Sequence, residues 1–195
     1  MRDQHELHPA IRDLVFVHIP KTAGTALRNA LADALPEHVK LFDYKEENTV
    51  GGDLIEARNS NHLTAADILA WRKKPGSNQS LFLCGHVFAR KYLGAFHPAS
   101  FVAFLRDPVD RLASSYDHHA RIHGFTGSFA DFCNTPKQIN LQSRMLRGID
   151  LRNIGFIGLT EFMPDMIDAL SRHLDATLSV KKENVGRRFG RPAID

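Results

Sequence analysis

The sequence predicts an α/β fold in which a central, mainly parallel β-sheet is covered by helices on both faces. Short, fully apolar runs such as 14–19 and 101–105 recur along the chain, and an amphipathic helical pattern follows several of them. Strands that are apolar throughout are buried on both faces, as in parallel sheets flanked by helices. The 195 residues fit one domain, 1–195, whose core we expect over about 14–175 with a basic tail at 176–195.

The first predicted unit is a strand followed by a helix. Residues 14–19 are β-branched, aromatic or otherwise mostly apolar, and Pro20 bounds them. Apolar residues then repeat at helical spacing over 27–35, which indicates an amphipathic helix. Pro36 is expected to end this helix, because proline lacks the amide proton that a helix interior needs.

The middle of the chain contributes one helix and two more strands. We interpret 42–61 as mostly loop, because it is polar and contains a Gly-Gly break. Thr64 and Asp67 have the spacing of a capping box, so a helix is expected from there to Trp71. The apolar runs 81–84 and 101–105 are both predicted to be buried strands.

The second half of the chain is mainly helical. A stripe of apolar residues over 109–120 predicts a long helix, and shorter helices are expected at 129–133 and 138–146. Residues 154–158 predict a last short strand. The stripe over 163–174 predicts the last helix.

Composition excludes several classes of protein. With 43% hydrophobic residues and a net charge of +3, the chain is not intrinsically disordered. Two cysteines exclude a disulfide scaffold, and no apolar run is long enough to span a bilayer. The first residues do not resemble a signal peptide, so we expect a cytoplasmic protein. The basic residues lack the aromatic interleaving of a nucleic-acid-binding module, so no nucleic-acid partner is predicted.

Three segments are expected to lie together at one edge of the sheet. In open parallel sheets, ligands bind beyond the carboxyl ends of the strands. The residues that follow three predicted strands are 20–25, 85–90 and 106–111. The sequence therefore predicts that the chemistry of this protein is carried there.

The segment 20–25, Pro-Lys-Thr-Ala-Gly-Thr, has the features of an anion site. Gly24 allows close approach of a ligand to the backbone, and Thr25 can cap the helix while offering a hydroxyl. Helix N-terminal amides favour phosphate, and Lys21 adds a full positive charge. The segment is not a Walker A loop, because Lys21 precedes the glycine. The alternative is an ordinary capped turn with a solvated lysine.

A second anion site is predicted at the end of the strand 101–105. Arg106 follows that strand and can grip a phosphate, and Ser114 on the next helix can donate to the same group. Arg111 is expected nearby on the polar side of the helix, and Asp107 is expected to cap it. The alternative for Arg106 is a structural ion pair with Asp110. Two anion sites on adjacent strands suggest a nucleotide with phosphates at two separate positions.

These residues carry a family resemblance. The stretches 16–25 and 106–114 resemble the 5′-phosphosulfate loop and the 3′-phosphate motif of sulfotransferases that use PAPS (3′-phosphoadenosine 5′-phosphosulfate). The first stretch has the form seen in the carbohydrate 2-O-sulfotransferase branch. Weaker similarities extend the resemblance over residues 14–185; they are at 85–88, 140–146, 158–161 and 184–185.

The resemblance implies a P-loop-like three-layer α/β fold and transfer of a sulfuryl group from PAPS to an acceptor hydroxyl. The product nucleotide is PAP, 3′-phosphoadenosine 5′-phosphate, and no metal is required. Lys21 would stabilise charge on the leaving phosphate oxygen. The residues expected to bind the nucleotide are Lys21, Thr22, Ala23, Gly24, Thr25, Arg106, Ser114, Arg187 and Arg188. The last two belong to the basic tail, whose alternative interpretation is a solvated, frayed end.

His86 is the candidate general base. It follows the strand 81–84 at the same sheet edge, and imidazole titrates near neutral pH. Its alternative role is to cap a turn. His18 lies inside the first strand and is expected to be a packed residue. The histidines at 118, 119 and 123 lack a completing ligand for a metal, so a histidine-rich surface helix is expected there.

The acceptor is not identified by these motifs, although the 2-O-sulfotransferase likeness favours a carbohydrate or small glycoconjugate. We expect Asn140, Gln142 and Arg144 on the acceptor side, where Arg144 would suit an acidic acceptor. Two other functions stay open, a non-catalytic domain that binds PAP or another nucleotide and a kinase-like phosphoryl-transfer enzyme. The sequence does not predict an oligomeric state.

Overall fold

The computed structural model describes residues 13–44 and 63–180, and its centre is a five-stranded parallel sheet. The strand order is β2-β3-β1-β4-β5, and every neighbouring pair is parallel. The strands are β1 (Leu14–Val17), β2 (Val39–Asp43), β3 (Leu81–Gly85), β4 (Phe101–Leu105) and β5 (Phe156–Leu159). The predicted P-loop-like three-layer α/β class is confirmed.

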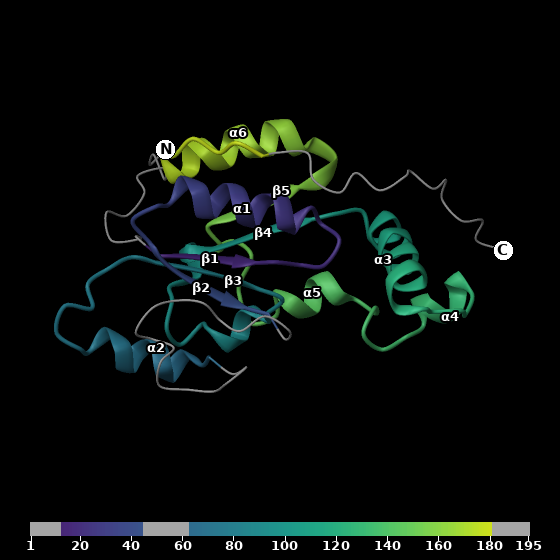
Figure 1. Cartoon of the computed structure of the whole chain (residues 1–195), viewed down its shortest axis with the longest axis horizontal. Coiled ribbons are helices and arrows are strands. Elements are labelled where there is room, and N and C mark those ends of the chain that lie inside the picture. Colours follow the sequence, from purple (N-terminus) through teal and green to yellow (C-terminus); the bar gives the residue numbers. More distant parts are fainter. Residues whose placement is uncertain (1–12, 45–62, 181–195) are drawn as a thin grey trace.

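Helices cover both faces of the sheet (Figure 1). One layer consists of α1 and α6, and the other contains α2 and α5, while α3 and α4 lie beyond one end of the sheet. The α-helices are α1 (Gly24–Ala34), α2 (Ala65–Arg72), α3 (Pro108–His123), α4 (Phe129–Cys133), α5 (Leu141–Met145) and α6 (Met163–Leu174). Three short 3₁₀ turns are η2 (Ala89–Lys91), η3 (Pro98–Ser100) and η4 (Thr160–Phe162).

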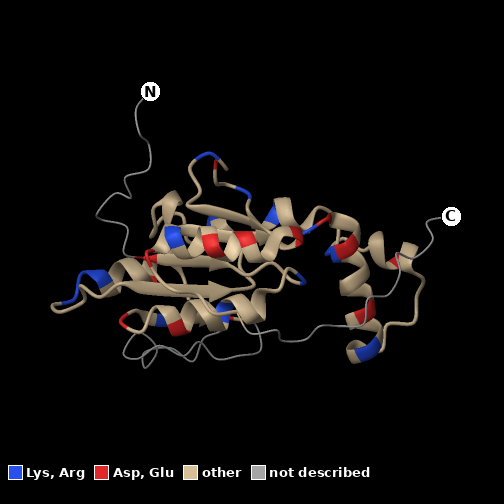
Figure 2. Ribbon diagram, turned by 90° about the horizontal axis from the view of Figure 1, so that it is seen from above, with Lys and Arg blue, Asp and Glu red and all other residues tan. Residues whose placement is uncertain are grey.

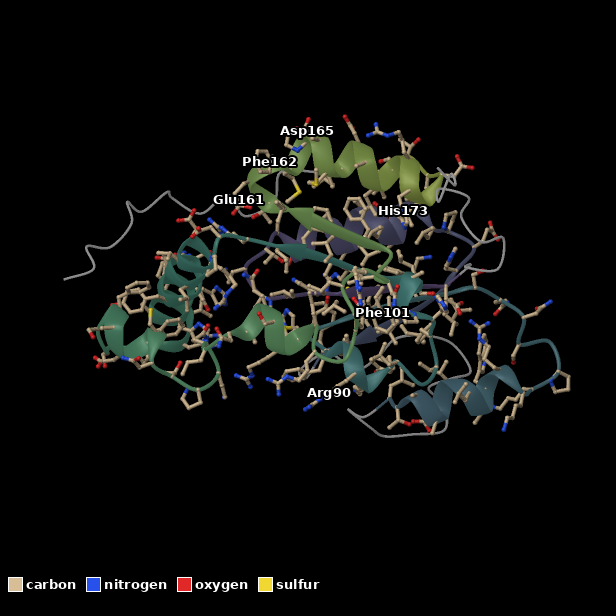
Figure 3. The ribbon with its side chains drawn as sticks, turned by 180° about the vertical axis from the view of Figure 1, so that it is seen from behind. Arg90, Phe101, Glu161, Phe162, Asp165 and His173 are labelled. Atoms are coloured by element: carbon tan, nitrogen blue, oxygen red, sulfur yellow. The ribbon has the colours of Figure 1, made fainter. Side chains whose placement is uncertain are left out.

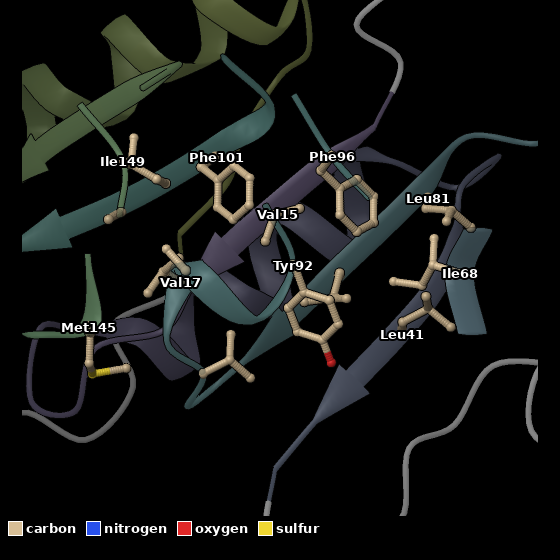
Figure 4. Packing of buried hydrophobic residues seen from close by; sticks show 14 of the residues in the cluster. Val15, Val17, Leu41, Ile68, Leu81, Tyr92, Phe96, Phe101, Met145 and Ile149 are labelled. Atoms are coloured by element: carbon tan, nitrogen blue, oxygen red, sulfur yellow. The ribbon is translucent and has the colours of Figure 1, made fainter. Parts of the chain in front are cut away.

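The core is divided by the sheet into two apolar clusters, because successive side chains of a strand point to opposite faces. Val15 and Val17 of β1 join the cluster that contains Tyr92 and Phe101 (Figure 4). Phe16, between them, joins the cluster on the α1 and α6 side. All five side chains are fully buried, so β1 is packed on both faces, as the sequence predicts for a central strand.

Charged residues are nearly absent from the strands of the sheet. In Figure 2 the charged residues colour mainly helices and connections, and β1, β3, β4 and β5 contain none. Within the described residues, no helix combines the length and the apolar character that crossing a membrane requires.

Most elements lie where the sequence predicts them. The capping box at Thr64 is confirmed, with Asp67 closing it in place of the usual longer side chain. The interpretation of 42–61 as loop is wrong at its start, because Phe42 and Asp43 belong to β2. This strand lies at the sheet edge and contains Lys40 and Asp43, so it lacks the apolar run that indicates the other strands. The rest of that loop, 45–62, lies outside the described residues.

Candidate functional site

Three neighbouring strands end at one edge of the sheet and carry the predicted functional residues. Because β3, β1 and β4 are adjacent and parallel, their carboxyl ends meet at this edge. His86 follows β3, Lys21 follows β1 and Arg106 follows β4. The structure therefore brings together three segments that are far apart in the sequence, as predicted.

The turn between β1 and α1 has an unusual backbone. Lys21 and Ala23 have positive φ angles of 71° and 60°, a conformation that residues other than glycine rarely adopt. Thr22 between them is fully buried, and its hydroxyl donates to the Ile19 carbonyl at 2.9 Å. The Thr22 hydroxyl therefore holds the turn together, while the neighbouring Ala23 is exposed.

Helix α1 begins without a side-chain cap. Its N-cap is Ala23, and among the described residues no side chain accepts from its first amides and its first turn holds no acidic residue. Thr25 is an exposed residue of the first turn and not the cap, which corrects the sequence prediction. The helix starts earlier than expected because the left-handed Ala23 directs the chain into it. Free amides at a helix N-terminus form a binding place for an anion.

Lys21 places its charge beside this helix start. The side chain is half-buried, and burial lowers the pKa of its ammonium group, with further lowering by the nearby Arg121 and Arg106. Asp117 opposes this shift. Among the described residues, two cations and one carboxylate thus act on the Lys21 ammonium, a balance that favours an anion beside it.

Arg106 connects the second anion site to the first. Its guanidinium Nη1 donates to the Lys21 carbonyl oxygen at 3.4 Å, across 85 positions of sequence. Its backbone is held on both sides by the Gln142 amide, which accepts from the Arg106 amide at 2.9 Å and donates to its carbonyl at 2.8 Å. Gln142, predicted on the acceptor side, thus fixes the position from which the Arg106 side chain extends.

Helix α3 begins at Pro108, two residues after Arg106, and the Asp107 side chain caps it. The Asp107 carboxylate accepts from the Val109 and Asp110 amides at 2.9 and 3.0 Å, which confirms it as the N-cap. The Asp107 amide in turn donates to the Glu161 carboxylate at 2.6 Å, and Glu161 lies where β5 passes into α6 (Figure 3). The N-terminus of α3 is therefore satisfied within the protein.

Two α3 side chains differ in their surroundings. Ser114 is half-buried, two turns into the helix from Arg106. Arg111 was expected on the polar side, but it is buried, with only 2% of its surface exposed. Its guanidinium donates to the Gln138 side chain at 3.3 Å, and burial lowers its pKa. Arg111 thus anchors the segment before α5, because its long side chain reaches inward from the helix.

His86 lies at the exposed edge of the site but is in contact with two other rings. Its centroid is 4.5 Å from that of His18 and 4.9 Å from that of Tyr44. His18 is buried, as predicted, and its Nδ1 is 2.7 Å from the Tyr44 hydroxyl. Burial, His86 and Arg28 lower the pKa of His18 to about 3, so its ring is neutral. Tyr44 was missed by the sequence interpretation because it follows the unrecognised strand β2.

The remaining predicted binding residues lie near α5 or outside the described residues. Asn140 is the left-handed N-cap of α5, with φ 49°. The Arg144 guanidinium donates to the Pro136 carbonyl at 2.5 Å and braces the preceding loop. Arg187 and Arg188 lie outside the described residues.

The histidines of α3 are packed together. His118 and His123 have ring centroids 5.5 Å apart, and those of His119 and His123 are 5.1 Å apart. The His119 Nδ1 is 2.8 Å from the Ser115 carbonyl oxygen, one turn earlier in the helix. Within the ranges 13–44 and 63–180, no group of three or more potential ligands has the arrangement that a metal ion needs.

Comparison with known proteins finds no matching family and no matching curated protein. Among solved structures, a sulfotransferase from Alicyclobacillus acidocaldarius is similar, with 17% identity and a TM-score of 0.45 over 88% of this chain and 85% of that one. A mouse sulfotransferase complexed with PAP has 14% identity and a TM-score of 0.45 over 88% of this chain and 60% of its own.

Retinol dehydratase in complex with androsterone and PAP has 15% identity and a TM-score of 0.43. That likeness covers 85% of this chain and 59% of the dehydratase. This chain therefore spans about three fifths of the length of both PAP complexes. At this level the similarity does not identify a substrate, so the site has to be judged by its own geometry.

Proposed function

We propose that this protein is a PAPS-dependent sulfotransferase that transfers a sulfuryl group to an acceptor hydroxyl. The observation that carries this proposal is the contact between the two predicted anion sites. The Arg106 guanidinium donates to the carbonyl of Lys21 at 3.4 Å, so the strand end after β4 and the turn after β1 form one continuous surface. A nucleotide with phosphates at two positions matches such a pair of sites.

The residues present fit PAPS. The uncapped start of α1 and the Lys21 charge suit the 5′-phosphosulfate. We propose the backbone of Thr22, Ala23 and Gly24 as its contacts, and Ala23 is the exposed residue of the three. Arg106, held in place through its backbone by Gln142, suits the 3′-phosphate, with Ser114 as a second donor. When bound, PAPS supplies the sulfuryl group.

Lys21 would act on the charge that develops during transfer. As the bond between the sulfuryl sulfur and the phosphate oxygen breaks, negative charge collects on that oxygen. A cation already in place stabilises this charge without reorganisation of solvent. Lys21 is half-buried in the turn that leads into α1, and Arg106 and the α3 residues Asp117 and Arg121 act on its ammonium group.

His86 would act on the acceptor. The acceptor oxygen forms the new bond to sulfur, and its proton passes to the His86 imidazole. His86 is exposed and lies beyond β3, beside the β1 turn. We expect His86→Ala to lower turnover by about 10²-fold or more, while PAP binding stays near that of the unmodified protein. Full turnover by this variant would overturn the assignment.

A carbohydrate hydroxyl is the acceptor we propose, on the strength of the similarity of 16–25 to the 2-O-sulfotransferase branch. Asn140 and Arg144 lie on or beside α5, next to the Gln142 that holds Arg106. They are therefore proposed for the acceptor side, and Arg187 and Arg188 are proposed to close over the nucleotide.

The proposal is tested by supplying radiolabelled PAPS with oligosaccharides, phenols and steroid alcohols as separate acceptors. Label transferred to an oligosaccharide, with stoichiometric release of PAP, is the expected result. PAP binding without transfer to any acceptor would favour a non-catalytic nucleotide-binding domain. Transfer of phosphate from ATP·Mg²⁺ instead would favour a kinase-like enzyme.

A further inference from the structure

The ring of His18 fills the space beside Gly24 in the β1 turn. A Cβ atom placed on Gly24 would lie 1.9 Å from Cδ2 and 2.0 Å from Nε2 of His18, far inside van der Waals contact. Gly24 is the first residue of α1 and is buried. The glycine is therefore needed because the imidazole occupies the volume of a side chain, and the ring touches the backbone proposed to face the phosphate.

The opposite edge of the same ring is held by Tyr44. The Tyr44 hydroxyl is 2.7 Å from His18 Nδ1 and 3.1 Å from the Cys84 sulfur. Imidazole nitrogen is a better acceptor than a thiol, so the hydroxyl donates to Nδ1 and accepts from Cys84. Burial and Cys84 raise the pKa of Tyr44 well above its usual value, which keeps its proton in place. This arrangement assigns the His18 proton to Nε2, on the side of Gly24.

Both residues also contact His86. The His86 centroid is 4.5 Å from His18 and 4.9 Å from Tyr44, with edge-to-face angles of 61° and 78°. The His18 amide donates to the carbonyl of Gly85, the residue before His86, at 2.9 Å. Arg28 of α1 lies over the Tyr44 ring at 5.4 Å and encloses it from another element. The His86 ring is therefore in contact with the uncharged rings of His18 and Tyr44, which a hydrogen bond holds together.

We propose that His18 and Tyr44 are positioning residues that couple the phosphate-facing turn to the orientation of the His86 imidazole. The proposal rests on the proposed function, which gives the turn a nucleotide and His86 a proton to accept. Any shift of the Gly24 backbone when a nucleotide binds displaces the His18 ring, because no free space separates them. The displacement passes to His86 through the ring contacts, so occupancy of the turn sets the direction of the base.

Imidazole ¹⁵N–¹H spectra test this coupling, recorded with and without PAP. The proteins compared are the unmodified chain, Tyr44→Phe and Tyr116→Phe. Tyr116→Phe is a matched control, since it also removes one hydroxyl, which donates to Gly127 at 3.1 Å in the region of α3 and α4. The Nε2–H tautomer of His18 is expected in the unmodified chain and the control, together with a PAP-dependent change at His86.

In Tyr44→Phe we expect the PAP-dependent change at His86 to be at least about twofold smaller, with PAP affinity within about threefold of normal. An undiminished change at His86 would contradict the coupling. If PAP binds none of the three proteins, the proposed function is wrong. The spectra recorded without PAP still test whether Tyr44 positions the His86 imidazole. Signals of His86 that are identical in Tyr44→Phe and the control would then overturn that positioning.

Discussion

The two strand-to-helix turns proposed to bind the nucleotide offer an anion different groups. The β1 turn leads into α1 with a left-handed Ala23 and no side-chain cap within the described residues, so we propose its backbone amides as the groups that bind an anion. The β4 turn leads into α3 with Asp107 as the cap, so its amides are satisfied and the charge comes from the Arg106 side chain. A backbone site recognises any phosphate of the right shape, whereas a single guanidinium can distinguish nucleotides that carry an extra phosphate.

The largest expected effect comes from removing the charge of the β1 turn. Lys21→Ala should lower sulfuryl transfer by about 10²–10³-fold, or roughly 3–4 kcal/mol, because the leaving oxygen loses its fixed cation. Lys137→Ala, at an exposed lysine, serves as the control in the same initial-rate assay. Equal rates for the two variants would show that the β1 turn is not the catalytic one.

The β1 turn should also be the part of the site that is sensitive to acid, because it packs against the neutral His18. The folded pKa of His18 is about 3, below its unfolded value, so the unfolded state binds an extra proton as the pH falls. The stability that His18 contributes is fully present above pH 6.5 and decreases below it, by about 2 kcal/mol from this residue between pH 7 and 5. His118 and His173, whose pKa values burial also lowers, act in the same direction.

Urea denaturation at these two pH values measures this difference. His18→Gln should reduce the loss of stability on acidification, and His97→Gln, at an exposed histidine outside the site, should leave it unchanged. If both variants lose the same stability as the unmodified protein, His18 does not titrate on unfolding as described.

Adding a cap to the β1 turn would make it resemble the β4 turn. Ala23 is exposed and left-handed, a conformation that aspartate and asparagine tolerate. Ala23→Asp places a carboxylate at the amides of α1, so PAP affinity should fall about tenfold or more by repulsion and competition. Ala23→Asn adds a similar volume without charge and should retain more of the affinity in calorimetry. An equal loss in both would indicate a steric cause.

Removing the cap of the β4 turn should affect stability more than binding. Asp107→Ala leaves the Val109 and Asp110 amides without their acceptor, which costs about 1 kcal/mol and lowers the melting temperature by about 2–4 °C. Ala23→Gly, at the uncapped turn, should not lower it, because glycine adopts φ of 60° without strain. Thermal unfolding followed by circular dichroism measures the melting temperature of both variants. A larger decrease for Ala23→Gly than for Asp107→Ala would contradict this prediction.

The sequence predicted the strands with continuous apolar runs and both turns, because those signals are local. It missed β2, whose pairing with β3 is the only reason for its extended form, and with it Tyr44. It also placed Arg111 on the polar side, since periodicity cannot show that a long side chain reaches inward to Gln138.

The partners within the site could not be predicted for a related reason. His18 was correctly expected to be packed, but its contact with Gly24 and its place beneath His86 depend on three strands coming together. Gln142 was expected to face the acceptor. Only the folded chain shows that its side-chain carbonyl oxygen and its NH₂ group both form hydrogen bonds with the Arg106 backbone. The contacts of His18 with His86 and of Gln142 with Arg106 join positions distant in sequence, so no local pattern predicts them.

The most direct measurement is calorimetric titration with PAP, ADP and ATP·Mg²⁺ at one fixed salt concentration, on the unmodified protein and Arg106→Ala. The substitution keeps the backbone groups that Gln142 holds and removes the side chain beyond Cβ, with its guanidinium and the hydrogen bond to the Lys21 carbonyl. We expect PAP to bind far more tightly than ADP. That advantage should shrink by about 10–100-fold in Arg106→Ala, the loss of a hydrogen bond to a charged group. ADP or ATP·Mg²⁺ binding as tightly as PAP would contradict recognition of a 3′-phosphate by the β4 turn.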